Sequence, residues 1–531
     1  MKILFLARRN TYFRNFDSVI RELASRGHSL LLAVDRDNAE GRPLVDALVA
    51  EFPGRITYGE IPPRPADDWT WIAGRLRHGL DHLRYQHRMF TDTPKLRERS
   101  RKRTPGIFVS LGTFVRRLAP WARRPVTALV DWLERATPTD PSARAYIEGY
   151  GPDVMLITPL IGLGSSQVDY LRAARAMGVP TGLAVWSWDH LSSKALIRDL
   201  PDRVFVWNDT QKAEATTFHG VPRERLVVTG AQCFDRWFGR SPSRDRDAFC
   251  RDVGLPADAP ILLYVCSAPF IGSQPEAPFV ADWVARVRAT ASARLRGASI
   301  LIRPHPSRRQ EWEAMDLSGH QNVVVWGRSP INPAGRNDYF DSLYHSTAVV
   351  GLNTSAFIEA GIAGRPVLTI LLPEWHENQL GTAHFKYLFE AGGGLLTSAR
   401  TFDEHLAQLD EVLLHPSTEV RPFVKSFVRP HGLDVAATPI FAREVEAMQM
   451  LAVPPPEPPR FQALARRLLE KALPLRHAVG HEHLVYAEAE LETVRRYRTM
   501  RSAKADRERE LKRQRAAERA AREAASARPL P

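Results

Sequence analysis

The sequence predicts an α/β protein of two domains, each built on a parallel sheet. Short apolar runs recur along the chain and alternate with longer segments of helical pattern. The runs lack strict polar–apolar alternation, which is typical of strands buried on both faces. A polar, proline-bearing stretch at 239–246 separates two series of such runs. The length of 531 residues suits about two to four domains, and a 44% hydrophobic content excludes disorder throughout.

The first series of runs predicts an N-terminal domain over residues 1–238. Alternation of strands and helices favours parallel strands joined by crossover helices, because a parallel pair needs a long connection. We expect its strands at 3–7, 29–34, 154–158, 181–186, 204–207 and 226–229, and its helices at 15–26, 165–177 and 209–219.

The second series predicts a C-terminal domain over residues 255–445. The same alternation applies, so a second parallel sheet with crossover helices is expected. We expect its strands at 261–266, 299–303, 323–326, 348–352, 367–371 and 394–397, and its helices at 277–294, 338–345 and 355–363.

A basic helical insert is expected at about 62–150, between the second and third expected strands of the first domain. Within 95–124, ten lysine and arginine residues stand against one acidic residue, Glu98, for a net charge of +9. Either the insert docks on an anionic membrane, or it is a solvated helical hairpin whose aromatic residues form a local core. Those aromatic residues are Trp69, Trp71, Tyr85, Phe90, Phe108, Phe114, Trp121 and Trp132.

The C-terminal part of the chain changes in composition. Five prolines within 452–460 indicate a stiff, extended linker. The tail at 461–531 is charged, and its last segment, 501–531, holds ten basic and five acidic residues. Because 501–531 has almost no large apolar side chains, the tail is expected to be a solvated helix or disordered.

Charge and cysteine content limit the partners and the compartment. Lysine and arginine outnumber aspartate and glutamate by 73 to 60, so the net charge is +13. Anionic partners are favoured: a phosphorylated ligand, a lipid surface or nucleic acid. The three cysteines fit neither a metal site nor a disulfide framework, and no apolar run is long enough to span a bilayer. We therefore expect a cytoplasmic protein, with the inner face of the cell membrane as a further location.

The strand expected at 299–303 ends in a candidate phosphate-binding motif. Arg303, Pro304, His305 and Pro306 follow one another directly. Proline fixes its own φ and holds the preceding residue extended, so Arg303 and His305 are presented rigidly. Ligands of open parallel sheets bind beyond the carboxyl ends of the strands. A guanidinium there can grip phosphate oxygens through two donors, and an imidazole can donate to phosphate or transfer a proton. The other interpretation is a proline turn with a solvent-facing arginine.

A second motif follows the strand expected at 348–352. Asn353, Thr354 and Ser355 precede a helix, and Glu359 lies about one turn into it. Free N–H groups and the helix dipole favour an anion at such a position, and short polar side chains can cap the helix or donate to phosphate. Glu359 can accept from ribose hydroxyls. The alternative is an ordinary N-capped crossover helix, with Glu359 complementing its dipole.

These two motifs, together with the continuation of the second through residues 360–367, resemble the donor half of GT-B glycosyltransferases. The resemblance is nearest to the branch of CDP-glycerol glycerophosphotransferases and capsule polysaccharide transferases. It implies two Rossmann-like domains facing a cleft, a nucleotide-diphosphate donor held mainly by the second domain, and no metal or other cofactor. By this resemblance Arg303, His305 and Ser355 contact the diphosphate and Glu359 the ribose. Glu359 stands where the glycerophosphotransferases commonly carry aspartate, so the transferred group stays open between a sugar and a polyol phosphate.

Further site residues are expected where the two domains face each other. The strand at 181–186 is followed by Asp189 and His190, which would face the cleft, and by Lys194. Asp189 is either the base that activates an acceptor hydroxyl or the N-cap of a helix, and Lys194 can neutralise a donor phosphate. His384, in a loop of the second domain, is expected to contact the donor. His305 and Asp189 are thus the candidate catalytic residues.

The tip of the first strand argues against a nicotinamide enzyme. Its loop carries arginines, including Arg14, and contains no GxGxxG motif. These arginines either bind an anionic acceptor or are simply solvated.

Three functional hypotheses follow. The first is a GT-B-type transferase that moves a sugar or polyol-phosphate group from a nucleotide-activated donor to a cell-surface polysaccharide or lipid-linked acceptor. The second is a sugar-nucleotide 2-epimerase of the same architecture, which would need several acids near the donor sugar. The third is a non-catalytic protein that binds anions or nucleic acid; it ranks last because neither basic stretch matches a nucleic-acid-binding module.

Overall fold

The computed structural model describes residues 1–473 apart from 66, 270–273, 314, 328, 331 and 417–418. Residues Met1–Ala465 form one compact unit. The linker predicted at 452–460 has no helix or strand up to residue 459, and α20 (Gln462–Ala472) follows it. The rest of the predicted tail, from residue 474 on, lies outside the described residues.

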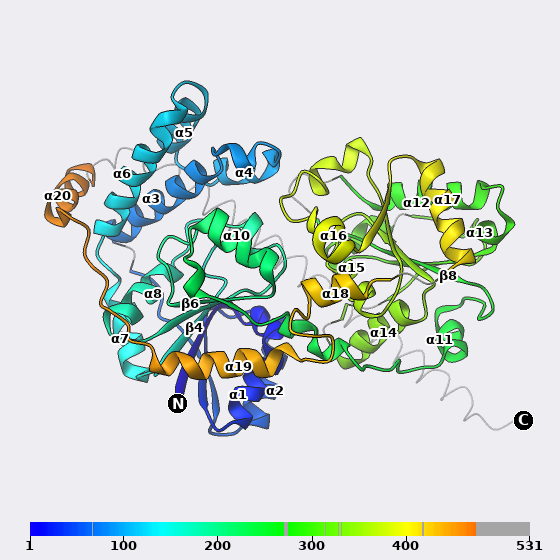
Figure 1. The fold of residues 1–531 in the computed structure, drawn as a ribbon, viewed down its shortest axis with the longest axis horizontal. Helices are drawn as coiled ribbons and strands as arrows, with labels where there is room; N and C mark the ends of the chain where they lie inside the picture. Colours follow the sequence, from blue (N-terminus) through cyan, green and yellow to red (C-terminus); the bar gives the residue numbers. More distant parts are fainter. Residues whose placement is uncertain are drawn as a thin grey trace, which may run out of the picture. The chain divides into compact units, whose positions relative to one another are not determined.

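A seven-stranded parallel sheet forms the first half of the unit (Figure 1). Its strands lie in the order β3-β2-β1-β4-β5-β6-β7. All six strands expected in this domain are present, and their apolar runs are buried on both faces, as in β4, which has no exposed residue. The strands are β1 (Lys2–Arg9), β2 (Ser29–Arg36), β3 (Ile56–Glu60), β4 (Val154–Thr158), β5 (Thr181–Ala184), β6 (Arg203–Val206) and β7 (Leu226–Val228).

Strand β3 was not expected from the sequence. It lies at the edge of the sheet, and of its five residues only Ile56 is buried. An edge strand of this kind needs no apolar run, so the pattern that marks the other strands is missing. The insert therefore follows the third strand of this sheet, which corrects its expected position after the second.

A six-stranded parallel sheet forms the second half of the unit, in the order β10-β9-β8-β11-β12-β13 (Figure 1). The two sheets and their helices confirm the predicted α/β class with two Rossmann-like halves. The strands are β8 (Ile261–Val265), β9 (Ser299–Arg303), β10 (Val323–Val325), β11 (Ala348–Gly351), β12 (Val367–Ile370) and β13 (Leu396–Ala399).

Helices connect the strands of both sheets. The helix expected at 277–294 is divided in two, because Ser292 accepts a hydrogen bond from the Leu295 N–H and starts a new helix. In the first half the helices are α1 (Asp17–Ser25), α2 (Arg42–Glu51), α8 (Gln167–Ala176), α9 (His190–Ser193) and α10 (Asp209–His219). In the second half they are α11 (Arg246–Val253), α12 (Ala277–Ala289), α13 (Ala293–Gly297), α14 (Pro333–Tyr344), α15 (Ala356–Ile362), α16 (Tyr387–Glu390), α17 (Phe402–Leu414) and α18 (Arg421–Phe427).

The insert is helical, as predicted. It comprises α3 (Asp68–Arg84), α4 (Pro94–Arg101), α5 (Gly106–Arg117), α6 (Arg123–Ala136) and α7 (Pro141–Tyr150). Part of its aromatic content forms a local core, because Tyr85 and Phe90 are buried and their rings meet edge to face at 4.9 Å.

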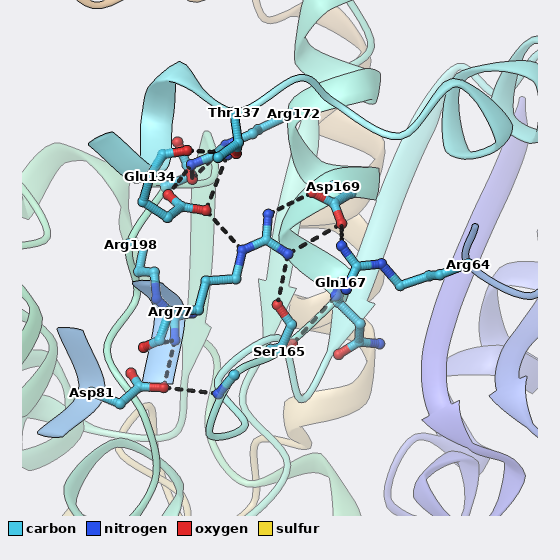
Figure 2. A network of polar contacts seen from close by, with 12 residues as sticks. Arg64, Arg77, Asp81, Glu134, Thr137, Ser165, Gln167, Asp169, Arg172 and Arg198 are labelled. Carbon is cyan, nitrogen blue, oxygen red and sulfur yellow. Dashed lines mark hydrogen bonds and ion pairs between the residues drawn. The ribbon is translucent and has the colours of Figure 1, made fainter. Parts of the chain in front are cut away.

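A buried ion-pair network joins the insert to the first sheet (Figure 2). Arg77 of α3 donates to Glu134 of α6 at 2.7 Å and to Asp169 of α8 at 2.6 Å. Arg172 of α8 donates to Glu134 at 2.5 Å, and Arg64 to Asp169 at 2.5 Å. Because α8 follows β4, this network fixes two insert helices against the crossover helix of the sheet.

The chain returns from the second sheet to the first after α18. The Ala231 N–H donates to the Val428 carbonyl at 2.9 Å, and α19 (Ala437–Ala447) then packs on the first sheet, where Phe441 stacks on Phe205 with ring centroids 4.5 Å apart. Gly230 has φ +87°, and a Cβ there would lie 2.9 Å from the Cβ of Ala437. Only glycine lets the returning segment approach this closely.

Among the described residues no helix is both long and apolar enough to cross a bilayer.

Candidate functional site

The predicted donor motifs lie at one edge of the second sheet. Strand β8 pairs with β9 on one side and β11 on the other, all parallel. The carboxyl ends of the three strands therefore point the same way, and the residues that follow them share one edge. Arg303 and His305 come from the end of β9, and Asn353 from the end of β11.

Arg303 contacts two aromatic rings. Its guanidinium carbon lies 5.4 Å from the ring centre of Trp326 and 5.2 Å from that of Tyr339, and its Nη1 donates to the Asp338 carbonyl at 3.3 Å. The residue is 6% exposed, and burial lowers its pKa to about 10. The group is therefore still a cation at neutral pH. Its enclosed position corrects the interpretation as a solvent-facing arginine.

Glu359 contacts the hydroxyl of the same tyrosine. The Tyr339 hydroxyl donates a hydrogen bond to the Glu359 carboxylate. Burial raises the pKa of Glu359 to about 7, against the opposing effect of that hydrogen bond and of Arg236 and Arg14. The tyrosine thus links a cation, Arg303, to a carboxylate that accepts a hydrogen bond.

His305 begins the 3₁₀ helix Pro306–Trp312. Its Nδ1 accepts a hydrogen bond from the Ser307 N–H at 3.2 Å, which places the ring proton on Nε2. Burial lowers the pKa of His305 to about 4, and Arg308 and Arg14 act in the same direction. At neutral pH the ring is uncharged, and it offers a donor at Nε2 rather than a positive charge.

We expect His305→Ala to reduce turnover far more than stability. The side chain is only partly buried and caps one short 3₁₀ helix, so its loss removes little packing. Loss of a cap costs roughly 1 kcal/mol, whereas loss of a group that acts on the leaving phosphate costs roughly 100-fold or more in turnover. Turnover and melting temperature of the same preparation test this. A large fall in melting temperature, or wild-type turnover, would contradict it.

The turn after β11 is built differently from the expectation. The Asn353 N–H donates to the Ser267 hydroxyl at 3.2 Å, and its side-chain amide donates to the Asn378 carbonyl. Thr354 Oγ1 accepts from the Ala356 N–H at 3.3 Å. Ser355 occupies the N-cap position, makes no side-chain capping bond and is exposed. Asn353 and Thr354 therefore hold the turn, and the Ser355 hydroxyl is the accessible group.

Asp189 forms an ion pair with Lys194, whose Nζ lies 2.9 Å from Oδ2. The hydroxyls of Ser187 and Ser193 also donate to its carboxylate. Burial opposes ionisation, but Lys194, His384 and the Ser187 hydrogen bond together lower the pKa of Asp189 far below its usual range. This environment favours a fixed ion pair over a proton-accepting base. Asp189 stands at the N-cap of α9 and makes no capping bond there.

His384 of the second half approaches this ion pair. Its ring lies edge to face on Trp188 at 4.5 Å and is 6% exposed. Burial lowers its pKa to about 4 in spite of the nearby Asp189. Asp189, Lys194 and His384, predicted from separate segments, are therefore brought together as one cluster.

His190 is not available to a ligand, which corrects the expectation that it faces a cleft. The residue is fully buried, and its Nε2 lies 2.9 Å from the Pro159 carbonyl. Burial lowers its pKa to about 3. The side chain ties the loop after β5 to the loop after β4.

Sequence reasoning missed the aromatic residues at the edge of the second sheet that carries the predicted donor motifs, which we call the donor edge. Trp326 directly follows β10, and Tyr339 lies on α14, far in sequence from Glu359. A tryptophan at the end of a predicted strand was the available signal. Arg14, which had two interpretations, influences the pKa of both His305 and Glu359 and so lies near the donor edge. No cluster of three or more candidate metal ligands occurs in the described part of the chain.

Comparisons with known proteins were made at the levels of sequence and structure. No family model and no curated protein matches the sequence. Among solved structures, UDP-GlcNAc 2-epimerase from Neisseria meningitidis, bound to UDP-GlcNAc, is 13% identical over 84% of this chain and 100% of its own, with a TM-score of 0.48. A glycosyltransferase from Rickettsia africae is 10% identical over 85% and 99%, with a TM-score of 0.48. WaaG, a glycosyltransferase involved in lipopolysaccharide biosynthesis, is 11% identical over 85% and 100%, with a TM-score of 0.43.

Proposed function

We propose that the chain is a GT-B-type transferase that binds a nucleotide-activated donor at the carboxyl edge of the second sheet. It moves a sugar or polyol-phosphate group to a polysaccharide or lipid-linked acceptor. The observation that carries the proposal is that Arg303 and Glu359 both contact Tyr339, Arg303 at the ring and Glu359 at the hydroxyl.

A nucleoside diphosphate has its ribose hydroxyls and its phosphates close together. A site for it therefore needs a hydrogen-bond acceptor beside a cation, on a rigid support. Glu359 supplies the acceptor and Arg303 the cation, while Trp326 and Tyr339 hold the guanidinium in place. His305, from the same strand end, adds a neutral donor.

The proposed reaction breaks the bond between the transferred group and the leaving nucleotide oxygen. Negative charge develops on the leaving phosphate, and Arg303 and the Nε2–H of His305 compensate it. The acceptor hydroxyl oxygen forms the new bond, and its proton passes to solvent, while the nucleotide leaves with the bonding electron pair on its phosphate oxygen. We assign the cluster of Asp189, Lys194 and His384 to the acceptor side, where Lys194 is paired with Asp189.

Nucleotide binding by Glu359→Gln tests the proposal. We expect the wild-type chain to bind at least one of UDP-, CDP-, GDP- or CMP-linked donors in a thermal-shift screen followed by calorimetry. A hydrogen bond to a charged group is worth roughly 1.5–3 kcal/mol, so Glu359→Gln should weaken binding by roughly 10- to 100-fold. Glu374→Gln, at an exposed glutamate of the same half, is the matched control. Unchanged affinity in Glu359→Gln, or no binding by the wild type, would refute the donor site.

One observation favours the 2-epimerase as a second candidate. Glu276 is buried near the end of β8, where it accepts from the Ser267 N–H at 2.8 Å and the Tyr264 hydroxyl at 3.0 Å. Burial raises the pKa of Glu276 to about 7, as it does for Glu359. Two carboxyl groups that titrate near neutrality suit the removal and return of a proton at a sugar carbon. A labelled nucleotide sugar separates the two reactions, because only transfer moves the label to an acceptor.

A further inference from the structure

The insert presents a row of large apolar side chains to solvent. Ile107, Phe114 and Leu118 follow one another at helical spacing along α5 and its end, and Trp121 lies in the following 3₁₀ turn, Pro120–Ala122. Their exposed fractions are 75%, 51%, 74% and 80%. We call these four residues the α5 patch. A contiguous exposed apolar patch marks a contact with another molecule or a membrane.

Another face of α5 packs on α3, which fixes the orientation of the helix. Gly112 and Val115 are buried. A Cβ on Gly79 of α3 would lie 2.7 Å from the Phe108 ring, and one on Gly112 would lie 2.9 Å from the His82 ring. These two glycines allow α3 and α5 to approach closely. The α5 patch is therefore the outer face of a packed helix.

Arginines flank the α5 patch. Arg116 and Arg117 end α5, and Arg123 and Arg124 begin α6. Arg116 donates to the Gln86 amide oxygen at 3.1 Å. Across the described ranges, none of these four arginines is ion-paired with an acidic side chain at salt-bridge distance. Burial and the neighbouring Arg124 lower the pKa of Arg123, so the cations repel one another and an anionic surface would relieve this.

We propose that the α5 patch docks on a bilayer that contains anionic lipid. The apolar side chains enter the interfacial region, and the four flanking arginines meet the headgroup phosphates. This combination of a tryptophan and aliphatic residues with basic neighbours is typical of interfacial membrane binding. The inference goes beyond the proposed donor site, because it concerns another surface and needs no nucleotide.

Two other occupants fit less well. The chain from residue 474 on carries 14 basic and 9 acidic residues, so its net charge of +5 has the wrong sign to cover a cationic surface. Nucleic acid would satisfy the arginines, but its bases stack on aromatic rings. Ile107 and Leu118, which are among the most exposed residues of the patch, are aliphatic and gain more from acyl chains.

Vesicle co-sedimentation of the full chain tests the proposal. The probes are phosphatidylcholine vesicles with and without phosphatidylglycerol, in low and high salt. We expect binding to the anionic vesicles, weakened by salt and nearly absent on pure phosphatidylcholine. Leu118→Ser with Trp121→Ser should weaken it by about 100-fold or more, since each large apolar side chain contributes roughly 1.5 kcal/mol or more, which is about tenfold. Arg117→Gln with Arg124→Gln should cost about fivefold per arginine.

Leu414→Ser is the matched control, because Leu414 is a 50% exposed leucine on α17, outside the insert. The control should bind vesicles like the wild type, and circular dichroism should show all variants folded. Equal binding by the Leu118/Trp121 double variant, or equal binding to neutral vesicles, would overturn the proposal. Displacement from vesicles by an oligonucleotide, with no effect of the serine substitutions, would assign the surface to nucleic acid. Vesicle binding is measured without nucleotide, so failure here is distinct from failure of the donor site.

Discussion

Arg77→Met is expected to lower the free energy of unfolding by about 3–5 kcal/mol, the cost of leaving buried charges without their partner. Arg77 is fully buried and pairs with Glu134 and Asp169, which come from two other helices. Methionine fills a similar volume but offers no positive charge. Both carboxylates would stay buried with fewer donors. Urea or thermal unfolding of the full chain measures the change.

Arg135→Gln is the matched control. Arg135 pairs with Asp131 within α6, and its side chain is 47% exposed. An exposed pair of this kind contributes at most about 0.5 kcal/mol. Combining Arg77→Met with Glu134→Gln should recover part of the loss, because the second change removes one uncompensated charge. A cost for Arg77→Met no larger than that for Arg135→Gln would show that the network does not stabilise the fold.

The pH dependence of the free energy of unfolding tests the same ion-pair network independently. Although burial opposes ionisation, Arg77 and Arg172 lower the pKa of Glu134 to about 2. A carboxyl group with a lowered pKa in the folded state stabilises the protein above its unfolded pKa, about 4.3. This contribution is lost as the pH falls from about 4 toward 2. The loss over this interval should be smaller in Arg77→Met, because one of the two groups that lower the pKa is absent.

Arg303→Met is expected to weaken binding of a nucleoside diphosphate by roughly 10- to 100-fold, from the roughly 1.5–3 kcal/mol of a charge-assisted hydrogen bond. The guanidinium is a cation at neutral pH and is held by two aromatic rings. The Arg303 side chain therefore has its orientation before the ligand arrives, which lowers the entropy cost of ordering it on binding. Calorimetry with the nucleoside, its monophosphate and its diphosphate should show the effect growing with the number of phosphates.

Arg286→Met is the control for the loss of one arginine in the same half. Arg286 is half exposed on α12, where it pairs with Asp282. It should bind nucleotides like the wild type. An equal loss of affinity for nucleoside and diphosphate in Arg303→Met, without loss of folding, would contradict a role in phosphate binding.

The sequence predicted the strands well where burial imposes an apolar run on both faces. It failed at β3, because an edge strand with one buried residue leaves no such run. It also joined α12 and α13, since the capping role of Ser292 depends on a local hydrogen bond and not on periodicity. Local sequence patterns therefore predicted helices and strands. The predictions failed where a single capping side chain or an edge position determined whether an element forms.

The candidate site was predictable only in part, for a related reason. Position at the end of a strand is a local property, so Arg303, His305 and Asn353 could be placed at one edge from the sequence. The partners of these residues come from distant segments. Tyr339 with Glu359, and His384 with Asp189, meet only through tertiary packing. The spacing of residues in the sequence therefore does not predict how these contacts shift each pKa, or that Asp189 is only weakly basic.

The local-core interpretation of the insert is confirmed for part of its aromatic residues only. Tyr85 and Phe90 form a local core, while Phe114 and Trp121 are exposed. Composition alone does not distinguish the two groups, because aromatic residues at helical spacing look the same on an inner and an outer face. The packing of α5 on α3 shows which face of α5 is buried and which is exposed.

Because the chain returns to the first half at Val428, the gene segment that encodes the second half can be exchanged as one piece. The six strands of the second sheet are encoded by one uninterrupted stretch, and the residues that leave and re-enter the first half, near Ala231 and Val428, are hydrogen-bonded neighbours. A coding segment whose two ends meet at one place can be cut out, or replaced by a homologous segment, with only two junctions to repair. Exchange of the second half between related chains would then need a single cassette, with the first half and its insert left untouched.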